Sequence, residues 1–574
     1  MLQKYPINLV ASKLLWVLFS LVLIPTTCVV YFNITVLLEW TLMSISSTPV
    51  MLTLILDPMG LMFSCTVLMI SANVLKFSTI YMAGDKFINR FTVLVLLFVL
   101  SMNLLIFLPH LMVLLLGWDG LGIVSFILVI YYQNPKSLAA GVITALTNRV
   151  GDVMLLLAIA WTLNQGHWNI LHMWVSGEMN YQVLAILIAA MTKSAQMPFS
   201  SWLPAAMAAP TPVSALVHSS TLVTAGVFLL IRFFSFMSSA WWFSPLLLFA
   251  AVLTTLMAGL SAATECDMKK IIALSTLSQL GMMMAAMGLN MVHLAFFHML
   301  THALFKALLF VCAGSFIHSH EHSQDLRWMG NLANQMPTTS SCLVMANLAL
   351  CGLPFMSGFY SKDLIVEASL FYTHNLLMVS LILVAVGLTS FYSMRFSLSV
   401  VWGVNSHSPF NHLEEGGSLT TPMLTLALMS VISGASILWL APLKQEMLVI
   451  PLHQKLLPLA LVFVGALVAW QMSSSVQETA ALPLILPMTH YASCMMWFLV
   501  PLSSQFMLKL PMYISLNYLK QTDQSWLEVL GGQGLSLASY KTSNMLMSSS
   551  TAGPMNYLMM SSVASLMMFM VMLT

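Results

Sequence analysis

The sequence predicts an all-α fold, a polytopic transmembrane helical bundle of about fifteen spans. Three observations predict this class. Of 574 residues, 59% are hydrophobic, and only 7% are Asp, Glu, Lys or Arg. The apolar residues also fall into runs of about 20, the length that crosses a bilayer. Soluble domains carry about 25% charged residues. The composition therefore excludes a soluble enzyme, a disordered protein and a disulfide-rich secreted domain.

The apolar runs give the order of the expected spans. The first is expected to be a retained helix, because it lacks the small-residue cleavage site of a signal peptide. The expected spans are 8–31, 51–80, 91–108, 109–132, 137–164, 182–207, 211–235, 241–264, 268–289, 290–317, 338–372, 375–402, 420–443, 454–472 and 555–573.

Two of these spans are interrupted beside a lysine. In 182–207, Lys193 is followed by Pro198, and in 338–372, Pro354 precedes Lys362. Proline removes a backbone donor and clashes with the preceding turn, so each helix is expected to break near its lysine. Broken helices in corresponding places of a long bundle are typical of transporters built from repeats.

The few ionisable residues at membrane depth are the candidate functional residues, since each costs at least about 2.5–3.5 kcal/mol to insert. Arg149 and Asp152 lie three residues apart and are expected to pair on one helical face. Each single residue could instead be a structural polar group that ties helices together. The first group is Asp119, Arg149, Asp152, Lys193 and His218.

His298, His302 and Lys306 follow at i, i+4 and i+8, which places them on one stripe of a helix. Successive members are about 6 Å apart along the axis, within reach of a bridging water. Histidine titrates near neutral pH, so such a ladder can pass protons. It is a poor metal site, because no third acidic ligand lies nearby and there is no H-E-x-x-H pattern.

The remaining composition bears on cofactors, partners and the genome. The seven cysteines form no C-x-x-C pair, which predicts neither a zinc nor an iron–sulfur site. The 20 basic and 18 acidic residues nearly balance, so the chain lacks the excess of positive charge that is typical of nucleic-acid-binding proteins. The 48 methionines indicate a mitochondrial codon bias. Residues 475–554 are too polar to cross a bilayer and predict an amphipathic segment along the membrane or a partner.

Six ordered motifs resemble the NADH-ubiquinone oxidoreductase chain 5 family, the distal antiporter-like subunits of respiratory complex I. The motifs are GWDGLG at Gly117–Gly122, NRVGD at Asn148–Asp152, TKSAQ at Thr192–Gln196, PTPVSALVHSST at Pro210–Thr221, THALFK at Thr301–Lys306 and GFYSKD at Gly358–Asp363.

The resemblance implies a division into N-terminal spans, two inverted five-helix halves, C-terminal spans, a lateral amphipathic helix and a terminal anchor. These parts correspond to 1–90, 91–235, 241–402, 403–474, 475–554 and 555–574.

The resemblance also implies a role for each site residue. Lys193 becomes the switch of the first half with Asp119 as its partner, and Arg149 and Asp152 form the neighbouring ion pair. His218 leads to a central axis of His298, His302 and Lys306. Lys362 with Asp363 reaches the exit side.

Two departures from the family pattern stand out. The family more often has Glu where this chain has Asp119, which shortens the reach toward Lys193 by one methylene. One further helix is usual before 51–80, and here only 8–31 is evident, so the first family helix is expected to be absent.

The resemblance implies the inner mitochondrial membrane and contacts with lipid and with the sister antiporter-like subunits, chains 4 and 2. It implies no cofactor in this chain, with NADH, FMN, iron–sulfur clusters and ubiquinone in other subunits. We therefore expect a proton-translocating subunit in which redox energy moves the Asp119–Lys193 pair. A lone cation/proton antiporter, a mainly structural subunit and a quinone- or flavin-binding subunit are the alternatives; no G-x-G-x-x-G fingerprint supports the last.

Overall fold

The computed structural model describes residues 6–45, 48–169, 179–320, 323–371, 375–404, 415–440, 449–474, 487–499, 501–551 and 553–573. The contacts divide the chain into two units, Met1–Val500 and Pro501–Thr574, and each unit is described by itself.

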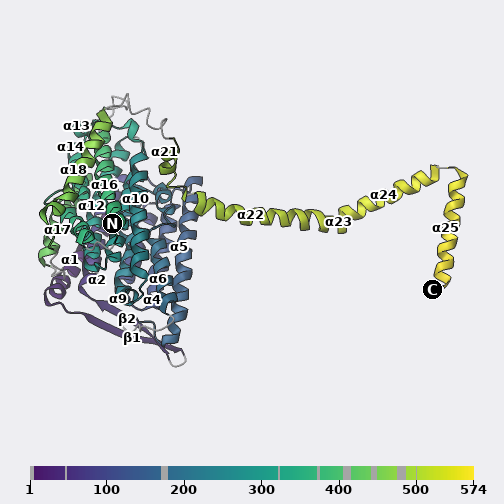
Figure 1. The fold of residues 1–574 in the computed structure, drawn as a ribbon, viewed down its shortest axis with the longest axis horizontal. Helices are drawn as coiled ribbons and strands as arrows, with labels where there is room; N and C mark the ends of the chain where they lie inside the picture. Colours follow the sequence, from purple (N-terminus) through teal and green to yellow (C-terminus); the bar gives the residue numbers. More distant parts are fainter. Residues whose placement is uncertain are drawn as a thin grey trace. The chain divides into compact units, whose positions relative to one another are not determined.

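The first unit is a bundle of long apolar helices (Figure 1). Its main helices are α1 (Ile7–Phe32), α2 (Pro58–Tyr81), α3 (Ile88–Phe107), α4 (Leu111–Val129), α5 (Pro135–Thr162), α6 (Met179–Lys193), α9 (Leu222–Met237), α10 (Phe243–Thr264), α11 (Met268–Gly288), α12 (Val292–Ser319), α14 (Pro337–Cys351), α15 (Leu364–Phe371), α16 (Leu376–Ser397), α17 (Gly417–Leu440) and α18 (Leu452–Ser474).

Shorter elements connect these helices. They are α7 (Trp202–Ala205), α8 (Thr211–Val213), α13 (Leu332–Gln335), α21 (Pro487–Cys494), the 3-10 turns η2 (Leu163–Gln165), η4 (Ala206–Ala208) and η6 (Leu326–Trp328), and the π-helical segments η5 (Ser214–Thr221), η7 (Phe359–Asp363) and η8 (Leu398–Trp402).

The predicted fold class is confirmed, since thirteen of the described helices are long and apolar enough to cross a membrane. About fifteen spans were expected. The difference lies in the two interrupted spans, because their longest helical pieces, α6 and α14, have 15 residues each. A helix of that length is shorter than the hydrocarbon layer.

An antiparallel hairpin interrupts the helices, so the expectation of a single helix over 51–80 is wrong at its start. Strand β1 (Val36–Ile45) pairs with β2 (Thr48–Leu56), with Val36 opposite Leu56. The helix begins only at Pro58, because Asp57 accepts a hydrogen bond from the Gly60 N–H at 3.2 Å and caps it. The hairpin lies at one end of the bundle (Figure 1).

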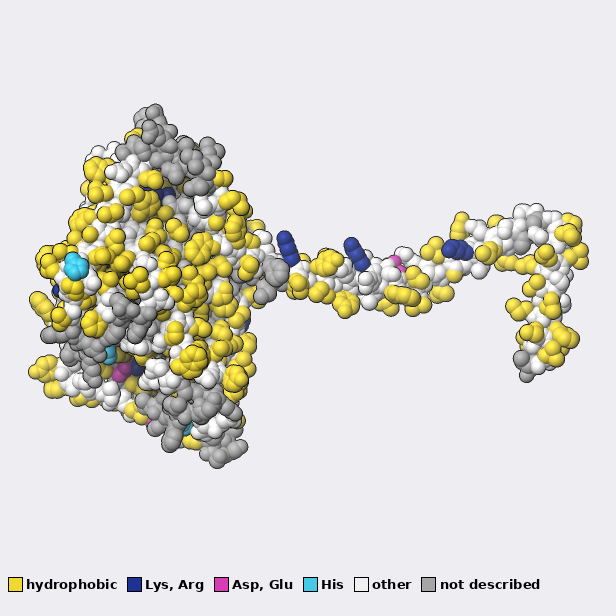
Figure 2. Space-filling model, viewed as in Figure 1, with side chains coloured by type: hydrophobic (Ala, Val, Ile, Leu, Met, Phe, Trp, Pro, Cys, Tyr) yellow, Lys and Arg dark blue, Asp and Glu magenta, His cyan; other side chains and the backbone are white. Residues whose placement is uncertain are grey.

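The centre of the bundle is formed by α11, α12 and the segment Thr211–Met237. The apolar windows of the last two are fully buried, and that of α11 is 94% buried. A helix that is apolar on every face belongs inside a bundle. Figure 2 shows hydrophobic side chains over most of the visible face of this unit, with few charged ones. Such a surface suits lipid, whereas Lys193, Lys306 and Lys362 are buried inside the bundle.

The second unit consists of helices with exposed side chains. Its elements are η9 (Pro501–Phe506), α22 (Met507–Tyr518), η10 (Leu519–Trp526), α23 (Leu527–Leu530), α24 (Gly532–Thr551) and α25 (Pro554–Leu573). The helical character of the predicted amphipathic segment is confirmed over Pro487–Cys494 and, apart from a bend at Gly531, over 501–551, whereas 475–486 lie outside the described residues. Large side chains such as Trp526 and Leu530 are exposed. Its contact with a partner stays a prediction.

Candidate proton-translocation site

The first interrupted helix ends on its lysine. Helix α6 stops at Lys193, and Ala195 adopts a φ of 53°. The Trp202 indole N–H donates to the Thr192 carbonyl at 3.0 Å, which satisfies an acceptor that the break releases. The break therefore leaves Lys193 inside the protein at a helix C-terminus, where a positive charge is favoured.

Lys193 is fully buried against Trp118 of α4. Its Nζ donates to the Trp118 carbonyl at 3.3 Å and lies 5.0 Å from the centre of the Trp118 ring. The same tryptophan donates from its indole N–H to Asp152 Oδ1 at 2.8 Å. Trp118 thus contacts both the buried cation and the buried acid Asp152.

The predicted pair of Arg149 and Asp152 is present on α5, with Nη1 and Oδ2 3.2 Å apart. Arg149 also lies 3.9 Å from Asp119 Oδ2. Among the described ion pairs within 4.0 Å, Asp119 is joined to Arg149 and not to Lys193. The structure therefore brings Arg149, Asp119 and Asp152 together, while the Asp119–Lys193 contact remains a prediction.

His218 lies in the π-helical segment η5, where backbone hydrogen bonds join residues five apart instead of four. The Ser220 and Thr221 hydroxyls donate back to the Leu216 carbonyl at 2.9 and 2.6 Å. Neither ring nitrogen of His218 has a hydrogen-bond partner among the described residues, although the side chain is buried. Single π-helical turns occur frequently at functional sites. The Trp202 ring packs against His218 with the centroids 6.3 Å apart.

The predicted ladder lies on α12 in the buried core. His298 contacts Ser361 Oγ at 2.9 Å through Nδ1 and Gln279 Oε1 at 3.2 Å through Nε2. The His298 and His302 rings are 6.1 Å apart, and both nitrogens of His302 lack a partner within the described chain. Lys306 Nζ donates to Ser275 Oγ at 2.5 Å. The stripe predicted from the i, i+4, i+8 spacing is confirmed in position.

Lys362 lies beyond the second interruption. Helix α14 ends where Gly352 takes a φ of 82°, a conformation that glycine adopts without strain. Lys362 Nζ, in η7, donates to the carbonyls of Leu350 and Cys351 at 3.3 and 3.4 Å and to Thr389 Oγ1 at 2.8 Å. The ammonium group therefore satisfies carbonyls that the end of α14 leaves free.

Asp363 follows Lys362 in the same segment and is partly buried. Within the described part of the chain, no ion pair shorter than 4.0 Å joins Asp363 to a cation. The second break thus lies at Gly352–Met356, before its lysine, whereas the first lies directly after Lys193.

Neutral side chains complete the site, and charge counting could not identify them. Ser275 and Gln279 lie four residues apart on α11 and contact Lys306 and His298, respectively. Ser361 joins His298 to Thr301 Oγ1, at 3.0 Å. The polar i, i+4 pair of Ser275 and Gln279, on a helix most of whose residues are apolar, is the signal that could have identified α11.

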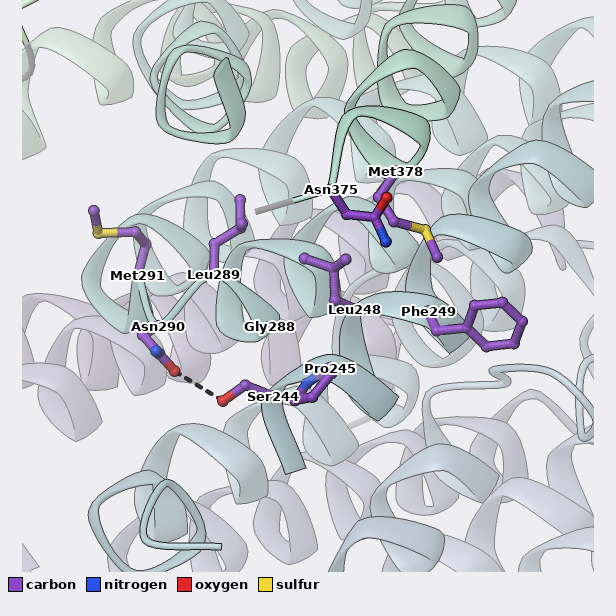
Figure 3. A pocket seen from close by; sticks show the side chains of 10 residues that line it. All are labelled: Ser244, Pro245, Leu248, Phe249, Gly288, Leu289, Asn290, Met291, Asn375 and Met378. Atoms are coloured by element: carbon purple, nitrogen blue, oxygen red, sulfur yellow. Dashed lines mark hydrogen bonds between the residues drawn. The ribbon is translucent and has the colours of Figure 1, made fainter. Parts of the chain in front are cut away.

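The described residues were compared with the ligand groups that a metal ion needs. Three His, Cys, Asp or Glu side chains suitable for a metal do not meet anywhere in that part of the chain. A cavity of about 730 Å³ lies where α10, α12 and α16 begin and α11 ends (Figure 3). Its lining is neutral, and Ser244 donates to Asn290 Oδ1 across it at 3.1 Å. None of the candidate site residues named above lines this cavity.

Sequence comparisons cover the chain in three consecutive parts. Residues 40–92 match the family described as "NADH-Ubiquinone oxidoreductase (complex I), chain 5 N-terminus". Residues 108–389 match "NADH:quinone oxidoreductase/Mrp antiporter, TM", and 392–573 match "NADH dehydrogenase subunit 5 C-terminus".

Individual relatives agree with these matches. NADH-ubiquinone oxidoreductase chain 5 of Lumbricus terrestris is 74% identical over 98% of each chain, and that of Anopheles gambiae is 49% identical over 86% of each. A chain of the Mrp complex from Dietzia has a similar structure, with a TM-score of 0.71 and 26% identity, over 82% of this chain and 54% of that one. The chain therefore belongs to the NADH-ubiquinone oxidoreductase chain 5 family, the membrane subunits of complex I.

Proposed function

We propose that this chain itself translocates protons for complex I, while NADH, FMN, iron–sulfur clusters and ubiquinone are held by other subunits. The observation that carries the proposal is the burial of six ionisable side chains in the membrane bundle. Lys193, His218, His298, His302, Lys306 and Lys362 are each at most 1% exposed. Insertion of one such group costs at least about 2.5–3.5 kcal/mol, so six of them need a function that offsets the cost.

The proposed path begins at Lys193 and ends at Lys362. From Lys193 a proton passes by way of His218 to the central axis of Lys306, His302 and His298. Ser361 accepts or donates next to His298, and Lys362 follows in the same segment. Hydroxyl and imidazole groups can each donate and accept a hydrogen bond, so they can hand protons on through intervening water.

The proposed switch is the choice of partner for Asp119. In the structure the carboxylate pairs with Arg149. Redox energy from elsewhere in the complex would move Asp119 toward Lys193, which favours the protonated amine. When Asp119 returns to Arg149, the Lys193 ammonium stays in an apolar site with only the carbonyl and the ring of Trp118 as partners. This favours release of its proton. Trp118 transmits the change, because it contacts Asp152 and Lys193 at once.

The proposed partners follow from two exposed features, the Arg149–Asp119 pair and the C-terminal tail, Pro501–Thr574. The side chains of Arg149 and Asp119 are 57% and 40% exposed in the isolated chain, although both lie within membrane helices. Charges facing lipid are costly, so a polar neighbour is expected to cover them. We propose that sister antiporter-like subunits, chains 4 and 2, cover this face and bind the tail, within the inner mitochondrial membrane. The C-terminal family match over 392–573 favours this assignment over a stand-alone antiporter.

Replacement of Lys362 by methionine tests the proposal. The variant is expected to assemble normally and to lower the number of protons pumped per electron, because the last buried cation of the path is lost. Lys136→Met is the matched control, since Lys136 is exposed at the start of α5. An unchanged proton-to-electron ratio in Lys362→Met, with normal assembly, would refute the proposed path.

A further inference from the structure

One side chain joins the break after Lys193 to helix α10 and has no part in the path described so far. Gln196 lies three residues beyond the end of α6 and is 1% exposed. Its Oε1 accepts a hydrogen bond from Thr254 Oγ1 of α10 at 2.7 Å. Thr254 is fully buried, so this contact lies inside the bundle, away from bulk water.

The backbone couples Gln196 closely to Lys193. The Gln196 N–H donates to the Met191 carbonyl at 3.0 Å, and Gln196 Nε2 donates to the Ser194 carbonyl at 3.4 Å. Ala195, between them, has a φ of 53° and turns the chain out of the helix. A movement of the Gln196 side chain therefore reaches the last turn of α6, which carries Lys193.

Helix α9 packs directly on the same break. A Cβ atom at Gly226 would lie 2.5 Å from the Ala190 carbonyl oxygen and 3.0 Å from the Ser194 nitrogen. Only glycine permits such a close approach of two backbones. The backbone at the break thus rests on α9, and the Gln196 side chain fixes it to α10.

The Thr254 hydroxyl has two acceptors but only one hydrogen. Besides Gln196 Oε1, the Ala251 carbonyl of its own helix lies 2.7 Å from Thr254 Oγ1. A hydroxyl donates one hydrogen and can rotate to suit its acceptor. If Gln196 withdraws, Thr254 still donates to Ala251, so no buried donor loses its partner. The contact can therefore open and close at a low cost.

Thr254 also lies against α11, the helix that contacts the central axis. A Cβ atom at Gly281 would lie 2.7 Å from Thr254 Oγ1. Two residues earlier on α11, Gln279 contacts His298 at 3.2 Å. Thr254 therefore lies between the break after Lys193 and the helix that contacts His298.

We propose that Gln196 and Thr254 are positioning residues for Lys193. While their contact is closed, it holds Lys193 against Trp118, and when it opens, the break can move. Neither side chain carries a proton of the path. The inference rests on the proposed function and adds the contact through which a movement at Lys193 reaches α10 and α11.

Two neighbouring threonines test the proposal in the assembled complex. Thr254→Val keeps the shape of the side chain and removes the hydroxyl. Thr255→Val is the matched control, because Thr255 is equally buried and donates to the Val252 carbonyl of its own helix at 2.7 Å. Loss of one hydrogen bond changes an equilibrium by about two- to tenfold.

Thr254→Val is therefore expected to pump fewer protons per electron and to change the dependence of pumping on pH, since the surroundings of Lys193 change. Thr255→Val is expected to keep the wild-type ratio and pH profile. Thr254→Ser retains the hydroxyl and is expected to restore both. An equal loss in Thr254→Val and Thr255→Val would indicate packing alone and would overturn the proposal.

A double variant tests whether the two residues act through one contact. Gln196→Met removes the same hydrogen bond from the other side, so it carries the test even if Thr254→Val fails to assemble. The two single variants and the double variant are expected to show the same loss, because each removes one shared bond. Wild-type pumping in Gln196→Met and Thr254→Val, alongside a loss in Lys193→Met, would refute the positioning role alone. Wild-type pumping in Lys193→Met would instead refute the proposed function.

Discussion

Replacement of Arg232 by leucine removes the cation from a buried ion pair that joins three helices. Arg232 of α9 donates through Nη1 and Nη2 to both oxygens of Asp57, at 2.5 and 2.8 Å, and to the Ile106 carbonyl of α3 at 3.1 Å. Its side chain is 15% exposed and that of Asp57 is 12% exposed. Asp57 also caps α2. The substitution leaves this carboxylate buried without its counter-charge.

Loss of one partner of a buried pair costs about 3–5 kcal/mol, because the remaining charge stays desolvated. Asp57→Asn removes the charge but keeps an oxygen that can accept from the Gly60 N–H. The double variant Asp57→Asn/Arg232→Leu therefore leaves no unpaired charge. It is expected to recover up to about 3 kcal/mol relative to the sum of the single variants, which is the coupling typical of contacting residues.

The free energy of unfolding can be measured by denaturing-detergent titration of the purified chain in micelles, followed by helical circular dichroism. The four proteins form a double-mutant cycle. If the two single variants add to the double variant within about 0.5 kcal/mol, the groups are independent and the reasoning is refuted. A wild-type stability of Arg232→Leu would contradict it equally.

Two further predictions concern the ends of helices. Glu415 accepts hydrogen bonds from the N–H groups of Thr338 and Thr339 at the start of α14, at 3.2 and 3.0 Å. Glu415→Ala is therefore expected to destabilise that end of the helix by about 1–3 kcal/mol and to speed proteolysis there. Unchanged proteolysis would contradict the role of Glu415 as a cap. The pKa of His110 is lowered to about 4, mainly because the side chain is buried and, to a smaller extent, because His167 lies nearby. The neutral form is therefore stabilised, so stability is full above about pH 6.5 and falls as the pH drops toward 4. Thermal inactivation of the complex between pH 8 and 5 should show this slope, and His110→Gln should reduce it; equal slopes would exclude His110.

The helices could be predicted from the sequence because a run of about 20 apolar residues has few other stable forms in lipid. The hairpin could not. Its second strand, Thr48–Leu56, is as apolar as the helix that follows, and only Asp57 and Pro58 mark the boundary. An N-cap followed by proline marks where the helix starts, but it does not identify the apolar residues before it as a strand.

The ionisable side chains of the candidate site could be listed from the sequence, but their contacts with other helices could not. Spacing along one helix determines the Arg149–Asp152 pair and the stripe from His298 to Lys306. Contacts between helices depend on packing, which spacing does not reveal. Nothing in the sequence therefore indicated that Trp118 contacts Lys193 or that Thr389 contacts Lys362. The partner of Asp119 also depends on how α4 packs on α5.

The proton-to-electron ratio of complex I in sealed membrane vesicles tests the central claim most directly, when Lys193→Met is compared with Lys136→Met. If this chain carries protons, the Lys193 variant assembles, still oxidises NADH and pumps fewer protons per electron than the control. If both variants pump with the wild-type ratio, the chain does not carry the protons, and the buried line from Lys193 to Lys362 is structural.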